Sequence, residues 1–195
     1  MSNVDVTVCI PSIPPRAHLL RRAVESVTRQ TSLPAALNVA LDEEGLGASL
    51  TRNRAAADAD TEWLAFLDDD DEFLPHHLEY LIRFAGETGA DYVFADFIVP
   101  QAPHFRLESF CYGEFDPENP LQTTITTVVR RSVFMDLGGF SDPTTMTRIH
   151  GDTVGEDYDF TKRCVAAGVD IKHLQQVTWY WHHHGNNTSG RKWNR

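Results

Sequence analysis

Cysteine is scarce in this sequence: Cys9, Cys111 and Cys164 are the three among 195 residues. They are odd in number and far apart, and none belongs to the closely spaced pair that marks a zinc site or a redox motif. A disulfide framework is therefore not indicated. We predict that the three cysteines are reduced structural thiols.

A long apolar run is also missing. No stretch approaches the roughly 20 consecutive apolar residues that a membrane-spanning helix needs. The opening residues, MSNVDVTVCIPS, lack the basic segment and apolar core of a secretory signal. We therefore expect no membrane span and a cytoplasmic location.

Positive charge is in deficit, because 17 Lys and Arg residues stand against 28 Asp and Glu residues and the net charge is −11 with His neutral. No basic stripe runs through the chain, so nucleic acid is not expected as a partner. Hydrophobic residues make up 42% and charged residues 23% of the sequence, which is the balance of an ordinary globular protein. The length predicts a single domain with a sizeable core.

The first 100 residues alternate between strand and helix patterns. Apolar or β-rich runs predict strands at residues 4–10, 37–42, 63–67 and 91–99. Between them, helices are predicted from apolar spacing over 19–27, from an Ala-rich segment over 48–60, and after Pro75, with Gly89 just past the end. Such alternation predicts an α/β fold built on a parallel sheet with right-handed crossovers.

The second half is less regular. Residues 100–120 are rich in proline and aromatic residues and indicate an irregular excursion of the kind that carries binding loops. After it, residues 123–140 predict a strand, a short helix and a glycine stop, and residues 155–168 predict a helix. A final strand is predicted before a polar tail.

Acidic side chains follow the strand predicted at 63–67, in the stretch WLAFLDDDDEF. Consecutive carboxylates repel one another, so they need either a solvated turn or a bound cation. In open parallel sheets, ligands bind just beyond the carboxyl ends of strands. Two interpretations are open on these residues alone: a solvated turn, or a divalent metal site formed by Asp68 and Asp70.

Two more acidic groups occupy comparable places. Asp42 ends the second predicted strand, and Glu156 with Asp157 open a later helix. Acids in the first turn of a helix are also favoured by the helix dipole and need no chemistry. If the strands are parallel, all three acidic groups lie at one edge of the sheet.

Four stretches, in this order along the chain, resemble the glycosyltransferases of family 2, which have the GT-A nucleotide-sugar fold. The first is VTVCIPS with the helix LLRRAVESVTRQT, and the second is TRNRAAADADTEWLAFLDDDDEFLPHHLE. The third comprises RRSVFMDLGGF and GEDYDF, and the fourth is the tail WHHHGNNTS. The resemblance implies one GT-A domain over residues 1–195, with a mostly parallel central sheet and helices on both faces.

The resemblance also implies a division of the chain. Residues 1–100 would bind the nucleotide sugar, residues 101–181 would form the acceptor and catalytic half, and residues 182–195 would be a flexible tail. The donor would be a nucleoside-diphosphate sugar, with a UDP-sugar as the first choice, and the acceptor is unknown.

Site residues follow from the same resemblance by position. Pro11 and Asp42 would line the base and ribose pocket, and Arg52 would lie near the diphosphate. Asp68 and Asp69 would contact the donor, Asp68 through the ribose or a metal-bound water. Asp70 would bind a divalent cation, Mn²⁺ or Mg²⁺, completing the Asp-x-Asp pair, and His184 would reach the same cation.

Asp157 resembles the general base of the family, and Glu156 beside it would contact the acceptor. The reaction implied is a single displacement at the anomeric carbon with inversion. Two alternatives stay open. A metal-dependent nucleotidyltransferase would usually carry a Gly-rich basic loop after the first strand, where PSIPPR has no glycine. A non-catalytic nucleotide-sugar-binding protein differs only in releasing no free nucleoside diphosphate.

Overall fold

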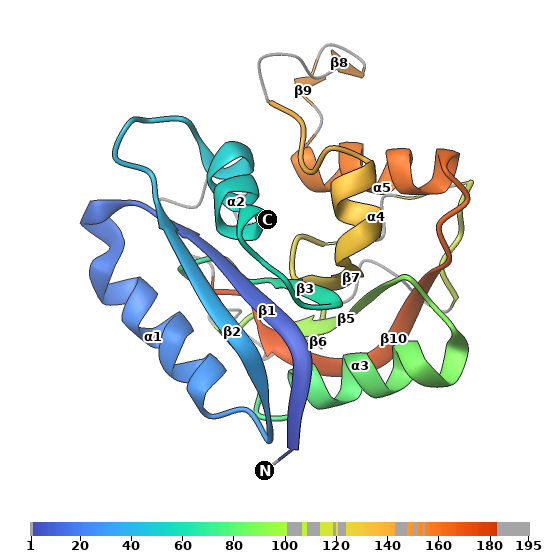
Figure 1. Ribbon diagram of the computed structural model, residues 1–195, viewed down its shortest axis with the longest axis horizontal. Helices are drawn as coiled ribbons and strands as arrows, with labels where there is room; N and C mark the ends of the chain where they lie inside the picture. The colour runs from blue at the N-terminus through green and yellow to red at the C-terminus, as the bar shows by residue number, and fades with distance from the viewer. Residues whose placement is uncertain are drawn as a thin grey trace.

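The computed structural model (Figure 1) describes residues 2–100, 107–108, 114–118, 120, 124–142, 148–149, 152–153 and 155–182. One large sheet forms its centre, in the strand order β2 (Ser32–Leu41), β1 (Ser2–Ser12), β3 (Trp63–Phe66), β7 (Thr127–Arg130), β5 (Tyr92–Ile98), β10 (Ile171–Tyr180) and β4 (Glu72–Phe73). β6 (Leu107–Glu108) pairs with β5, and β8 (Arg148–Ile149) pairs with β9 (Asp152–Thr153) in a separate small sheet.

The direction of most strands agrees with the predicted parallel sheet. β1 is parallel to both β2 and β3, and β5 is parallel to β10. β7 lies between β3 and β5 and is antiparallel to both. The strands β2, β1, β3, β5 and β10 therefore all point the same way, while β7, β4 and β6 are reversed.

Helices cover both faces of the sheet, as predicted. The 3₁₀ turn η1 (Pro14–Arg16) leads into α1 (Ala17–Thr28), which lies with α3 (His77–Thr88) on one face. The other face carries α2 (Ala48–Ala57), α4 (Arg131–Asp136) and α5 (Glu156–Ala166) (Figure 1). Alternate residues of each central strand supply the two cores: in β3, Ala65 packs on the α1 and α3 side, and Leu64 and Phe66 pack on the other.

Among the differences from the sequence prediction, two have an identifiable reason. β2 begins at Ser32, earlier than predicted, and includes Pro34. β2 is an edge strand, where the missing N–H of proline costs no ladder bond. β4 was not predicted, because two residues carry no periodicity; the strand exists through its antiparallel pairing with β10. α3 ends as predicted, with Gly89 in the left-handed region at a φ of 76°.

The cysteine prediction is confirmed where the structure describes it. Cys9 and Cys164 are free and buried, and burial raises the pKa of both thiols to about 12, so they stay protonated at neutral pH. Cys111 lies outside the described residues. Within the described part of the chain, none of the helices has the length and apolar character required to cross a bilayer.

Candidate active site

A pocket of about 230 Å³ opens at the carboxyl ends of β1, β2 and β3. The six residues predicted for the donor side all line it: Pro11, Asp42, Arg52, Asp68, Asp69 and Asp70. They come together because parallel strands place their carboxyl ends, and the loops that follow, at one edge of the sheet. Ser12, Arg16 and Trp181 also line the pocket and were not predicted.

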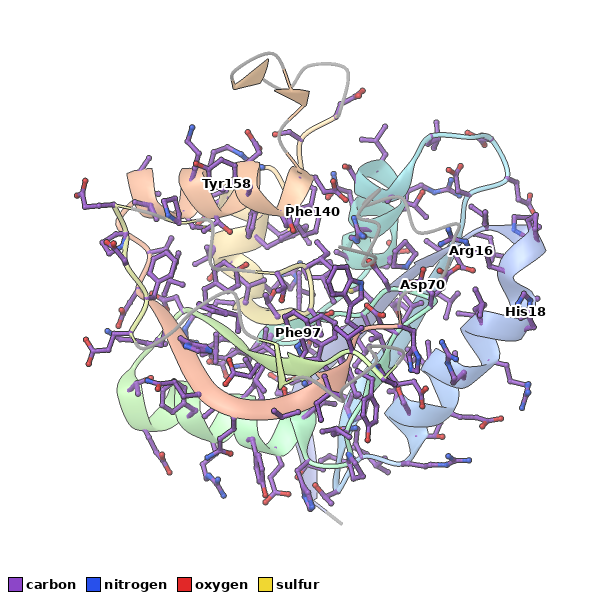
Figure 2. All side chains as sticks on the ribbon, turned by 180° about the vertical axis from the view of Figure 1, so that it is seen from behind. Arg16, His18, Asp70, Phe97, Phe140 and Tyr158 are labelled. Atoms are coloured by element: carbon purple, nitrogen blue, oxygen red, sulfur yellow. The ribbon has the colours of Figure 1, made fainter. Side chains whose placement is uncertain are left out.

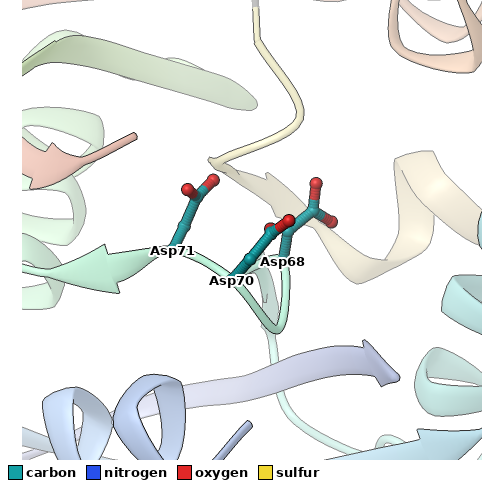
Figure 3. Close-up of side chains that lie close together, drawn as sticks. All are labelled: Asp68, Asp70 and Asp71. Atoms are coloured by element: carbon teal, nitrogen blue, oxygen red, sulfur yellow. The ribbon is translucent and has the colours of Figure 1, made fainter. Parts of the chain in front are cut away.

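The carboxylates of Asp68, Asp70 and Asp71 are the group within the described residues that offers metal ligands. One oxygen from each lies within 4.8 Å of the others, and the three side chains project to the same side of the turn after β3 (Figure 3). Burial, followed by repulsion from Asp70 and Asp68, raises the pKa of Asp71 well above its usual range. Clustered carboxylate oxygens suit a hard divalent cation, whose charge would offset this repulsion. The residues therefore fit such an ion, with Asp71 as a member that sequence reasoning missed.

Asp69 is not part of this carboxylate group and is bonded instead to residues at and after the end of β1. Its Oδ2 accepts a hydrogen bond from Ser12 Oγ at 2.6 Å, and its Oδ1 accepts one from Arg16 Nη1 at 3.1 Å. The same guanidinium nitrogen lies 3.6 Å from Asp70 Oδ2, and Figure 2 shows Arg16 and Asp70 side by side. Asp69 thus ties the loop after β1 to the pocket wall. The signal for Arg16 in the sequence was a lone basic residue in PSIPPR, which no pattern marks.

Asp42 holds the loop that leads into α2. Its two carboxylate oxygens accept hydrogen bonds from the backbone N–H groups of Leu46 and Gly47, each at 2.8 Å. These bonds favour the ionised carboxylate and lower the pKa of Asp42. Gly47 has a φ of 89°, a conformation that side-chain-bearing residues rarely adopt.

Arg52 joins two acidic groups that are far apart in the sequence. Its guanidinium contacts Asp68 Oδ1 at 2.5 Å through Nη2 and Glu156 Oε1 at 2.5 Å through Nη1. The Arg52 side chain is only 5% exposed. Burial opposes the charge, but the attraction of Asp68 and Glu156 raises the pKa of Arg52 above its ordinary value. Arg52 thereby joins Glu156, at the start of α5, to the aspartates of the pocket.

Asn53, the next residue of α2, fastens the segment after α4. Its side chain donates to Phe140 O at 2.8 Å and accepts from Phe140 N at 2.9 Å. A Cβ on Gly139 would come within 2.6 Å of Asn53 Oδ1, and the φ of Gly139 is 70°, so a larger residue would displace the Asn53 side chain and strain the backbone. α2 therefore fixes both the start of α5, through Arg52, and the loop after α4, through Asn53.

Asp157 follows Glu156 at the start of α5, and neither lines the pocket itself. Burial and then repulsion from Glu156 raise the pKa of Asp157. For Glu156, burial acts in the same direction, but Arg52 outweighs it and the pKa falls. Two adjacent carboxyl groups thus differ in proton affinity because only one of them pairs with a cation.

The end of β10 reaches the same place. Trp181 lines the pocket, and the His182 backbone N–H donates to Asp71 Oδ1 at 2.8 Å. His182 Nε2 also lies 2.7 Å from Glu72 Oε1. His184 and the rest of residues 183–195 lie outside the described residues, so the predicted role of that histidine stays a prediction.

Comparison with solved structures shows the fold. The S. aureus TarS fragment 1–349 in complex with UDP-GlcNAc matches with a TM-score of 0.75 at 16% identity, over 98% of this chain and 62% of that chain. TarS itself matches with a TM-score of 0.70 at 17% identity, over 94% and 37% of the respective chains. The fragment in complex with UDP matches with a TM-score of 0.69 at 16% identity, over 94% and 61%. The chain thus spans under two thirds of the length of these proteins.

Comparison by sequence shows the family. No curated protein matches significantly. The family model for "Glycosyl transferase family 2" matches residues 37–138, which include the second half of β2, α2, the acidic turn and the segment through α4. This match covers just over half of the chain, and the solved structures share its GT-A fold, so the chain belongs to glycosyl transferase family 2, a family of glycosyltransferase enzymes.

Proposed function

We propose that this chain transfers a sugar from a nucleoside-diphosphate sugar to an acceptor hydroxyl in a single, inverting displacement assisted by a divalent cation. The observation that carries the proposal is that acidic residues from two segments line one pocket and that a third segment is joined to them by a pocket-lining arginine. Asp42 follows β2, Asp68 and Asp70 follow β3, and Glu156 is bound to Asp68 through Arg52.

The donor is assigned to the pocket at the ends of β1, β2 and β3. Pro11, Asp42, Asp68, Asp69 and Asp70 all line this pocket. Pro11 and Asp42 are assigned to the base and ribose, and the three aspartates after β3 to the rest of the donor and its cation. UDP is the nucleotide bound in one related structure and UDP-GlcNAc in another, which supports a UDP-sugar as the first donor to test. Residues 1–100 would bind this donor, and residues 101–181 would receive the acceptor.

Asp70 is assigned as a direct ligand of Mn²⁺ or Mg²⁺, with Asp68 and Asp71 within reach of the same ion. His184 is proposed to approach it from the tail. A divalent cation held there would neutralise the charge that develops on the departing nucleoside diphosphate.

Asp157 is assigned as the general base. It would accept the proton of the acceptor hydroxyl while that oxygen attacks the anomeric carbon, and the bond to the diphosphate breaks on the opposite side. The raised pKa of Asp157 supports this role, because a carboxylate with higher proton affinity is the stronger base. Glu156, paired with Arg52, would stay ionised and contact the acceptor. The cytoplasmic location predicted from the sequence remains a proposal.

The proposal is tested by donor screening followed by product analysis. Thermal unfolding is measured with UDP-, GDP-, ADP- and dTDP-sugars in the presence of Mn²⁺, because a ligand that binds the folded state raises its melting temperature. The donor that stabilises the protein is then incubated with candidate acceptors, and free nucleoside diphosphate is measured. Stabilisation without release would identify a non-catalytic binding protein, and the absence of any stabilisation would refute the proposed donor class.

Gly155→Ala tests the placement of the base. A Cβ at this position would lie 2.5 Å from Asp157 Oδ1, so the carboxylate must rotate away. The φ of Gly155 is −61°, which alanine adopts without strain. We expect turnover to fall by up to roughly a hundredfold, the scale of a misplaced catalytic group. The melting temperature should fall slightly, because Gly155 is the N-cap of α5 and alanine is the poorer cap.

Gly86→Ala is the matched control, because a Cβ there meets nothing within 4 Å and alanine favours the helix. Its turnover should equal that of the wild type. Equal turnover in Gly155→Ala would show that the observed orientation of the Asp157 carboxylate is irrelevant to the reaction.

The tail gives a further prediction. Trp181 lines the pocket and His182 N–H donates to Asp71, so the residues that follow begin beside the proposed metal ligands. They include His184, Arg191 and Lys192, whose side chains suit a metal-diphosphate complex. We expect UDP with Mn²⁺ to slow hydrogen exchange across residues 182–195, as closure of a lid would.

His184→Ala is expected to lower turnover by roughly tenfold or more, as loss of a metal contact does. His18→Ala, at an exposed residue of α1, serves as the control for loss of a histidine. Unchanged hydrogen exchange together with normal turnover of His184→Ala would show that the tail has no role in the active site.

A further inference from the structure

Two arginines line the donor pocket within the described residues, Arg16 and Arg52. They differ in their surroundings. Arg52 is 5% exposed and lies between two carboxylates that contact different guanidinium nitrogens at 2.5 Å. Arg16 is 22% exposed and reaches the pocket from the end of η1. Of the two arginine side chains, that of Arg16 is therefore the more accessible to solvent.

Asp69 holds Arg16 in this position. The Asp69 carboxylate is 3% exposed, and its two oxygens are engaged by Ser12 Oγ and Arg16 Nη1. A buried carboxylate that accepts from both partners fixes the direction of the arginine side chain before any ligand arrives. Preorganisation of this kind lowers the entropy lost when the ligand binds.

The place where Arg16 is held is next to the proposed metal ligand. Arg16 Nη1 lies 3.6 Å from Asp70 Oδ2, so an anion bound at Asp70 through a cation would meet the guanidinium as well. A guanidinium carries several N–H donors in a planar fork, and it can contact Asp69 and a phosphate oxygen at the same time.

We infer that Arg16 is the one of the two pocket-lining arginines of the described residues that contacts the donor diphosphate. Asp69, which also accepts a hydrogen bond from Ser12, holds it in place. Arg52 is a positioning residue that keeps Asp68 and Glu156 at a set separation and so links the donor aspartates to α5. This inference rests on the proposed function, which supplies the nucleoside-diphosphate donor, and it separates two arginines that share one pocket.

The test compares binding constants of Arg16 variants for three ligands in the presence of Mg²⁺: UDP, UMP and uridine. Arg16→Gln removes the charge, and Arg16→Lys keeps it without the planar fork. A charge-assisted hydrogen bond contributes about 1.5–3 kcal/mol, so Arg16→Gln should lower the affinity for UDP by roughly tenfold to a hundredfold. The loss should be smaller for UMP and absent for uridine, and Arg16→Lys should fall between wild type and Arg16→Gln.

Two further variants make the result specific. Arg21→Gln changes the net charge equally at an exposed α1 residue, whose side chain is 74% exposed and pairs with Glu25, and it should bind UDP as the wild type does. Arg52→Lys should lower turnover more than it weakens UDP, because its contacts are to Asp68 and Glu156.

Each contrary outcome has its own meaning. If the wild type binds none of the UDP, GDP, ADP and dTDP forms, the proposed function fails, and this assignment fails with it. If the wild type binds UDP and Arg16→Gln binds it equally well, the assignment of Arg16 alone is overturned. An equal loss for UDP and uridine would also overturn it, because Arg16 would then contact the nucleoside.

Discussion

Asp70→Asn is expected to abolish sugar transfer, with a fall in turnover of at least about a hundredfold, because an amide is a much weaker ligand than a carboxylate for a hard cation. Asp70 lies with Asp68 and Asp71 in a group of oxygens within 4.8 Å of one another. Removing one negative charge should weaken binding of the metal and, with it, binding of the donor. The measurements are turnover with saturating donor and the rise in melting temperature caused by Mn²⁺.

The variant also has a readout that does not depend on activity. Repulsion from Asp70 contributes to the raised pKa of Asp71, so an amide at position 70 relieves strain between charges. This gain offsets the loss of the Arg16–Asp70 ion pair at 3.6 Å, so the metal-free variant should unfold at about the same temperature as the wild type, whereas Mn²⁺ should no longer stabilise it.

Asp60→Asn is the control, because Asp60 is exposed and outside the pocket. Wild-type turnover should also be lost in excess chelator and recovered with Mn²⁺ or Mg²⁺. Undiminished turnover in chelator, or normal turnover of Asp70→Asn, would refute metal assistance.

Asp157→Asn is expected to lower turnover by about 10²–10⁴-fold while leaving the affinity for donor within about twofold of wild type. The amide has the shape of the carboxylate but cannot accept the proton of the acceptor. Donor affinity should persist because Asp157 does not line the pocket. Turnover and donor binding are measured separately, with Asp60→Asn again as the control.

The dependence of turnover on pH provides a second test of Asp157 as the base. Burial and Glu156 raise the pKa of Asp157, so this carboxylate takes up a proton at a higher pH than an ordinary aspartate. Wild-type turnover should fall as the pH decreases through that raised pKa, because the protonated acid cannot act as a base. In Asp157→Asn this limb should vanish. Near-normal turnover of Asp157→Asn would show that another residue is the general base, with Glu156 the first to test.

Much of the site was accessible from the sequence because local patterns mark the ends of strands. The apolar run at 63–67 predicts the buried strand β3, whose residues are all buried, and the acids after it must then lie at the carboxyl edge of the sheet. The same reasoning places Asp42 after β2. Position-by-position resemblance added Pro11 and Arg52, and all of these residues line one pocket.

Other features depend on which distant segments meet, and no single segment encodes that choice. Arg52 and Glu156 are separated by 104 positions, and Asp71 and His182 by 111. The insertion of β7 between β3 and β5, and the pairing of β4 with β10, follow from packing of the whole sheet.

The sequence alone therefore determined the α/β class, the run of strands and helices, and the acids at the strand ends, because periodicity and turn chemistry are local properties. Only the tertiary structure decided the partners of those acids. In the fold, Asp69 accepts hydrogen bonds from Arg16 and Ser12. Arg52 bonds both Asp68 and Glu156, and Asp71 accepts the N–H that follows β10. The physical reason is that a carboxylate can pair with any nearby donor or cation, and the folded sheet determines which one is near.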